Sequence, residues 1–86
     1  DLQRALDPHA LAELFGLTPT QARVAVLLAD GLTAAEIGQR LGCALTTVRT
    51  HLRQVLAKLG ARRLADAVRL LRQGEALWAK AAAPGG

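Results

Sequence analysis

Polar and basic side chains gather on one face of residues 45–59, a segment whose residue spacing predicts a helix. Arg49 and Arg53 are one helical turn apart on that face. A guanidinium can donate two hydrogen bonds to O6 and N7 of guanine, and a threonine methyl group can contact the methyl group of thymine. A helix with these side chains would read base edges in the major groove. The candidate base-reading residues are Thr46, Arg49, Thr50, Arg53 and Gln54.

Three polar residues flank this face and are predicted to position the helix rather than to read sequence. Thr47, His51 and Lys58 would meet phosphate oxygens of the DNA backbone. Solvation alone would explain a single exposed arginine. A pair of arginines opposite an apolar stripe favours contact with bases.

The positive charge of the chain is concentrated in one segment. The net charge is +4, but residues 37–65 hold six basic residues and no Asp or Glu, which leaves −2 on the rest of the chain. Such a segment indicates a polyanionic partner, most commonly nucleic acid. The alternative is a basic face that contacts only solvent. The six residues are Arg40, Arg49, Arg53, Lys58, Arg62 and Arg63.

The elements that must position these side chains form a helix-turn-helix pattern. Thr33, with Glu36 three residues later, forms a capping box that opens a short helix ending before Gly42. Gly42 lies in the predicted turn, and Gly38 lies where the two helices must approach each other. The second helix carries an apolar stripe and ends at a glycine. The stripe consists of Leu45, Val48, Leu52, Val55, Leu56 and Leu59.

Two further helices are predicted before this pattern. Asp7 and Pro8 suit the cap and the first position of a short helix that ends near residue 15. Thr18 and Gln21 form a second capping box, which opens a helix over about residues 19–30.

One amphipathic helix is predicted after the pattern. Apolar residues repeat at the i, i+3, i+4 and i+7 spacing over residues 64–73, and Gly74 is the expected end of the helix. Trp78 is expected to anchor the following tail on the core, and the last few residues are expected to be disordered. The repeating residues are Leu64, Ala67, Val68 and Leu71.

Length and composition favour one all-α domain. The chain has 86 residues, enough for one core, and is 51% hydrophobic but only 2% aromatic. Ala, Leu and Val therefore dominate the core, and they suit closely crossing helices. The predicted fold is a four-helix helix-turn-helix domain with a short extra N-terminal helix. Residues 1–16 would form an N-terminal extension, residues 17–73 the core and residues 74–86 a C-terminal tail.

Several classes of protein are disfavoured by what the sequence lacks. No apolar run approaches the ~20 residues that cross a bilayer, and no signal peptide is visible, so we expect a cytoplasmic protein without membrane contact. Cys43 is expected to pack rather than to react, and His9 and His51 give no metal-ligand spacing. No phosphate loop, nucleophile elbow or paired carboxylates are visible. We therefore predict no enzyme activity and no cofactor.

Four short motifs occur in an order and spacing that resemble a known family. They are residues 17–19 (LTP), 29–42 (ADGLTAAEIGQRLG), 47–52 (TVRTHL) and 58–60 (KLG). Together they resemble the C-terminal helix-turn-helix domain of LuxR-type bacterial transcription regulators, of the GerE and FixJ kind, over roughly residues 17–72. The resemblance implies that the third of four helices enters the major groove and that the fourth pairs with its copy. By position, Arg49, Thr50 and Arg53 match base-contacting residues of the family, whereas Thr47 and His51 match residues that touch the DNA backbone.

Some positions depart from the family pattern. The run from Thr20 to Arg23 replaces the Arg-Glu that often follows Thr-Pro, so an ion pair of that glutamate would be weakened or replaced by an amide hydrogen bond. Ala44 stands where a serine usually caps the DNA-reading helix, and Cys43 where Ile or Val is common. Loss of a cap costs about 1 kcal/mol.

The sequence therefore predicts sequence-specific binding to double-stranded DNA by the effector domain of a transcription regulator, as a homodimer on two half-sites. The dimer interface would use Leu64, Val68 and Leu71. The alternative is a helical protein-interaction module that uses the same apolar face without binding DNA. RNA binding is less favoured because the chain lacks stacking aromatics.

The resemblance also implies a larger protein, because family members usually carry a sensor or receiver domain ahead of this one. This chain starts at Asp1, so we expect it to be a fragment. RNA polymerase would be a further partner, although no residue in the sequence marks that contact.

Overall fold

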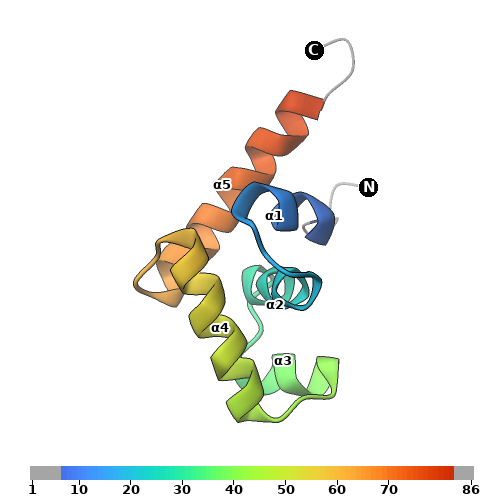
Figure 1. Cartoon of the computed structure of the whole chain (residues 1–86), viewed down its shortest axis with the longest axis vertical. Helices are drawn as coiled ribbons and strands as arrows, with labels where there is room; N and C mark the ends of the chain where they lie inside the picture. The colour runs from blue at the N-terminus through green and yellow to red at the C-terminus, as the bar shows by residue number, and fades with distance from the viewer. Residues whose placement is uncertain (1–6, 83–86) are drawn as a thin grey trace.

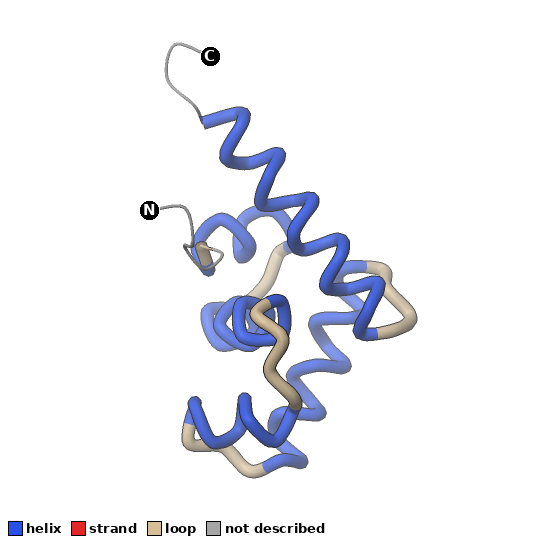
Figure 2. Tube along the Cα trace, turned by 180° about the vertical axis from the view of Figure 1, so that it is seen from behind, coloured by secondary structure: helices blue, strands red, loops and turns tan. Residues whose placement is uncertain are grey.

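The computed structural model describes residues 7–82, which form five α-helices. They are α1 (Pro8–Phe15), α2 (Pro19–Ala29), α3 (Ala34–Leu41), α4 (Leu45–Leu59) and α5 (Leu64–Ala82). The described residues contain no strand (Figure 2). The all-helical fold that the composition predicts is confirmed.

Local capping signals define the starts of the first three helices. The Asp7 carboxylate accepts a hydrogen bond of 2.9 Å from the backbone N–H of His9 at the start of α1. Reciprocal capping boxes open α2 and α3, with Thr18 and Thr33 as the caps. Each box satisfies backbone N–H groups that a helix start leaves without a partner. The predicted bounds of these helices agree with the structure to within one residue.

The last helix is longer than its sequence predicts. It does not end at Gln73 but continues through Gly74 to Ala82. A glycine that ends a helix usually has a positive φ, as Gly42 does at 72°, whereas Gly74 is not among the glycines with positive φ. Gly74 instead allows close packing, because a Cβ atom there would lie 2.6 Å from Cζ of the Phe15 ring. The predicted stop is therefore wrong: the glycine makes room for α1 beside α5.

A single hydrophobic core joins all five helices. Figure 1 shows α2 in the middle of the molecule, and it contacts each of the other four helices. The largest fully buried side chains come from every helix: Leu11, Val24, Ile37, Val48, Val55 and Leu71.

The burial of Leu71 corrects the predicted dimer surface. Its exposed fraction is 0%, so in this arrangement its side chain belongs to the core of one chain and offers no surface to a second chain. Leu64, at 44% exposed, and the half-buried Val68 remain accessible on α5. The side chain of Trp78 and the last few residues, for which we also made predictions, lie outside the described side chains and residues.

A tight turn joins α3 to α4. Gly42 caps α3 with a left-handed backbone, and its N–H donates to the carbonyl oxygen of Gly38. A Cβ atom on Gly38 would lie 2.8 Å from the carbonyl oxygen of Cys43, too close for any side chain. The predicted close approach at Gly38 is confirmed. Cys43 itself is half-buried and packs against the core.

Different helices form the two ends of the molecule. In Figure 1, α3 and the first half of α4 lie at one end, while α1 and the second half of α5 lie toward the other. The Arg72 guanidinium of α5 donates to the carbonyl oxygen of Ala29, where a cation is favourable at the C-terminus of α2.

Among the described residues, no helix combines the length and apolar character needed to span a membrane.

Candidate nucleic-acid interface

One side of α4 packs into the core and the other faces solvent. Val48, Leu52 and Val55 are buried. Seven of the eight predicted contact residues are exposed: Thr46, Thr47, Arg49, Thr50, Arg53, Gln54 and Lys58. The structure thus brings most of the predicted site to the surface of a single helix.

The two arginines predicted to read bases are free in this structure. Neither Arg49 nor Arg53 forms a hydrogen bond or ion pair with the described residues, in which the one ion pair joins Arg69 to Asp66 at 3.2 Å. A guanidinium offers five N–H donors in a planar array that suits guanine and phosphate. These donors are therefore available to a ligand of α4.

The basic segment as a whole lies on the surface. The six basic residues between positions 37 and 65 are all exposed. Their charges therefore act on the solvent side of α3, α4 and the connection to α5, where they can attract a polyanion.

Thr50 is held in place by its own helix. Its Oγ1 donates to the carbonyl oxygen of Thr46 at 3.1 Å. This bond uses the hydroxyl proton and fixes the rotamer, so Thr50 can offer a ligand only its methyl group and the acceptor lone pairs of Oγ1.

Lys58 and Gln54 are engaged inside the chain, which the sequence did not predict. The ammonium group of Lys58 donates to the carbonyl oxygen of Gly16 at 3.0 Å and to Oε1 of Gln21 at 2.7 Å. Nε2 of Gln21 donates to Oε1 of Gln54 at 2.8 Å. Because an ammonium group has three N–H donors, Lys58 keeps one for phosphate.

Gln21 is a site residue that the sequence reasoning did not single out. It is 6% exposed and joins the start of α2 to two residues of α4. Its amide forms hydrogen bonds with Gln54 and Lys58, which agrees with one of the two outcomes expected for this departure from the family pattern. Its partners on α4 could not be found from spacing, because they lie 33 and 37 residues away.

His51 lies at the edge of the exposed face and is half-buried. Its Nδ1 is enclosed and has no hydrogen-bond partner among the described residues. A contact between His51 and the DNA backbone would therefore use Nε2.

The start of α4 lacks a side-chain cap. Ala44 holds the N-cap position with φ −68° and ψ 153°, and no side chain there accepts a hydrogen bond. This extended conformation is the usual one for a capping residue. Ala44 is therefore the N-cap residue of α4, as the sequence predicts, and the helix start lacks the stabilisation that a serine there would provide.

Replacing Ala44 by serine is expected to raise the free energy of unfolding by about 1 kcal/mol. The backbone already has the required conformation, and the new hydroxyl can accept from an N–H of the first turn. Urea titration of both proteins measures the change. Ala44→Val is the matched control, because it adds volume without an acceptor; equal stabilisation by both variants would contradict the capping explanation.

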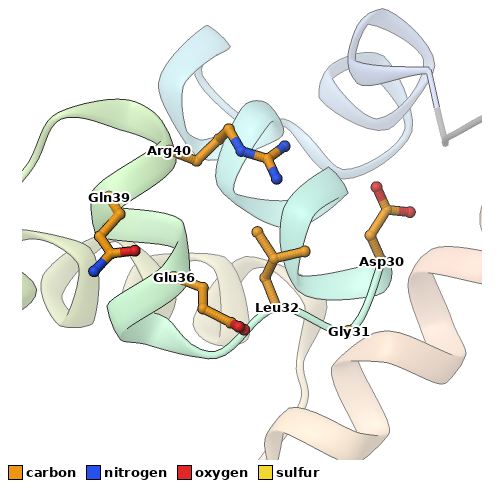
Figure 3. Close-up of a pocket in the computed structure, with 6 residues that line it drawn as sticks. All are labelled: Asp30, Gly31, Leu32, Glu36, Gln39 and Arg40. Carbon is orange, nitrogen blue, oxygen red and sulfur yellow. The ribbon is translucent and has the colours of Figure 1, made fainter.

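An open hollow of about 620 Å³ lies away from α4, at the connection of α2 to α3 (Figure 3). Its lining includes Asp30 and Glu36, and Arg40 extends across it from α3. The Glu36 carboxylate already accepts from the backbone N–H of Thr33 at 2.8 Å. No lining residue belongs to α4, and the described residues contain no group of three side chains that could hold a metal ion. The hollow therefore contains none of the predicted contact residues of α4, although Arg40 of the basic segment lines it.

Two helices packed across a glycine turn, the second with free guanidinium groups on its outer face, define a helix-turn-helix protein. Residues 16–71 match the family model described as bacterial regulatory proteins, luxR family. The match spans more than half of the chain, and the chain belongs to this LuxR family of DNA-binding transcription regulators.

A curated relative supports the same class. The chain is 46% identical over 50 residues to the C4-dicarboxylate transport transcriptional regulatory protein DctR of Rhodobacter capsulatus. The alignment covers 58% of this chain but only 25% of the relative, so the chain corresponds to a small part of that regulator. No solved structure gave a significant match to the chain.

Proposed function

We propose that this domain binds specific sequences in double-stranded DNA by inserting α4 into the major groove, as the effector domain of a transcription regulator. The observation that carries the proposal is the exposed face of α4, where Arg49 and Arg53 have no partner within the described residues. An exposed α-helix fits the major groove, and arginine paired with guanine is the commonest specific contact there.

The other exposed residues of α4 take supporting roles in this proposal. Thr46 and Thr50 face the same side as Arg53 and can offer methyl groups to thymine. Thr47 and the remaining N–H of Lys58 are placed on the flank, where they meet phosphate oxygens. His51 contributes through Nε2 on the same flank.

Two copies of the domain would pair through α5 on a DNA site with two-fold symmetry. Leu64 and Val68 are the accessible apolar residues of the predicted interface, and Leu71 is not part of it. Helix-turn-helix dimers read two half-sites whose spacing matches the symmetry of the protein. The relative is named for C4-dicarboxylate transport, and we assign this chain only the DNA-binding step.

Selection from a pool of random DNA duplexes at two salt concentrations tests the proposal. We expect the domain to enrich a sequence with dyad symmetry, and its affinity to fall with salt with a log-log slope of about −0.9 per phosphate neutralised. No retention even at low salt would refute DNA binding and favour the alternative, a protein-interaction module that uses Leu64 and Val68.

A further inference from the structure

The amide group of Gln21 can have only one orientation. Its Oε1 lies 3.1 Å from the backbone nitrogen of Thr18 and 2.7 Å from Nζ of Lys58. A backbone N–H and an ammonium group can only donate hydrogen bonds. The atom of Gln21 between them must therefore be the oxygen, and the nitrogen must point the other way.

This orientation determines how Gln54 is turned. Nε2 of Gln21 is a donor, and it lies 2.8 Å from Oε1 of Gln54. Only the carbonyl oxygen of Gln54 can accept that hydrogen bond. Gln54 is exposed on α4, and its amide nitrogen is therefore the atom left without a hydrogen-bond partner among the described residues.

We infer that Gln21 is a positioning residue for DNA recognition, which makes Gln54 a hydrogen-bond donor toward the DNA. The inference rests on the proposed function, since it applies only if α4 contacts bases. Thr18 and Lys58 fix the orientation of the Gln21 amide, and Gln21 fixes the orientation of the Gln54 amide. This series of hydrogen bonds ends in a donor, the amide nitrogen of Gln54.

The consequence is a defined preference for acceptor groups on the DNA. A glutamine reads adenine by accepting from N6 and donating to N7 at the same time. Gln54 cannot do both easily, because its oxygen already accepts from Gln21 on the inner side. Its nitrogen suits atoms that only accept, namely O6 and N7 of guanine, N7 of adenine, O4 of thymine and phosphate oxygens.

Replacing Gln21 by glutamate should reverse the polarity of Gln54. A carboxylate can accept from Thr18 and from Lys58 as glutamine does, but it offers Gln54 only an acceptor. Gln54 would then turn its nitrogen inward and present its oxygen to the DNA. We expect the relative affinity at one base of each half-site to move roughly threefold to tenfold toward a base with an exposed amino group, cytosine or adenine.

Two readouts on the whole domain test this inference. The first uses no DNA: side-chain amide exchange measured by NMR should show the Gln54 protons unprotected in the wild type and protected in Gln21→Glu. The second is the base preference of each protein in the random-duplex selection. Gln21→Glu also adds a negative charge, which weakens binding to all sequences and does not move the preference by itself.

A double-mutant cycle separates the relay from a general effect of the new charge. In a Gln54→Ala background, Gln21→Glu should weaken binding uniformly and leave base preference unchanged. Unchanged Gln54 exchange in Gln21→Glu, or an equal shift of preference without Gln54, would overturn the inference. If the wild type selects no DNA at all, the proposed function fails, while the exchange measurement still decides the orientation of Gln54.

Discussion

Replacing Arg49 or Arg53 by alanine is expected to weaken binding to the selected DNA sequence by about 1–3 kcal/mol each, roughly 5- to 150-fold. Both guanidinium groups are exposed on α4 and have no partner within the described residues, so their removal leaves no internal contact broken. The bidentate contact to guanine is lost with the side chain, and the alanine that replaces it has no hydrogen-bond donor. Fluorescence anisotropy with the selected duplex and with a random duplex measures both affinities.

The comparison of the two duplexes distinguishes base reading from attraction to phosphate. If the arginines read bases, the variants lose affinity mainly for the selected duplex and relax specificity at one position per half-site. Arg62→Ala is the matched control, because Arg62 is also exposed but lies outside α4. Equal losses on both duplexes would reassign Arg49 and Arg53 to phosphate contacts.

Features of the fold that depend on neighbouring residues were predictable from the sequence. The capping boxes at Thr18 and Thr33 involve residues three apart, and the glycine that ends α3 acts through its own backbone. Such signals act locally, so they indicate helix ends without knowledge of the rest of the fold. The face of α4 followed in the same way from the spacing of its apolar stripe.

The sequence was misleading where a residue's role depends on a distant partner. Gly74 resembles a helix stop, yet Phe15 packs against it, 59 positions earlier in the chain, and the helix continues. Lys58 resembles a free phosphate contact, yet Gly16 and Gln21 accept two of its hydrogen bonds. Residue type and spacing carry no information about these contacts, because they form only when the helices pack.

The amphipathic stripe of α5 shows the same limit for a whole surface. Periodic apolar residues indicate that one face of a helix is buried, but not whether it is buried within a chain or between chains. The structure divides this stripe: Leu71 is in the core, while Leu64 remains 44% exposed. This division leads to a prediction with a large effect on stability.

Leu71→Ala is expected to lower the free energy of unfolding of the single domain by about 2–5 kcal/mol. The side chain is fully buried among residues of the other helices, so its removal leaves a cavity as well as losing apolar contacts. A domain of this size has a total stability of only about 4–13 kcal/mol, so much of the population could unfold. Urea titration monitored by circular dichroism measures the loss.

Leu64→Ala is the matched control, since it makes the same chemical change on the exposed part of the same helix. It should alter the unfolding free energy of the isolated domain by less than about 1 kcal/mol and instead weaken cooperative binding to a two-half-site duplex. For Leu71→Ala the loss should be independent of protein concentration, because it arises within one chain. A loss that appears only at concentrations where the domain dimerises would return Leu71 to the interface, and would mean that α5 packs differently in the dimer from the arrangement in the single chain.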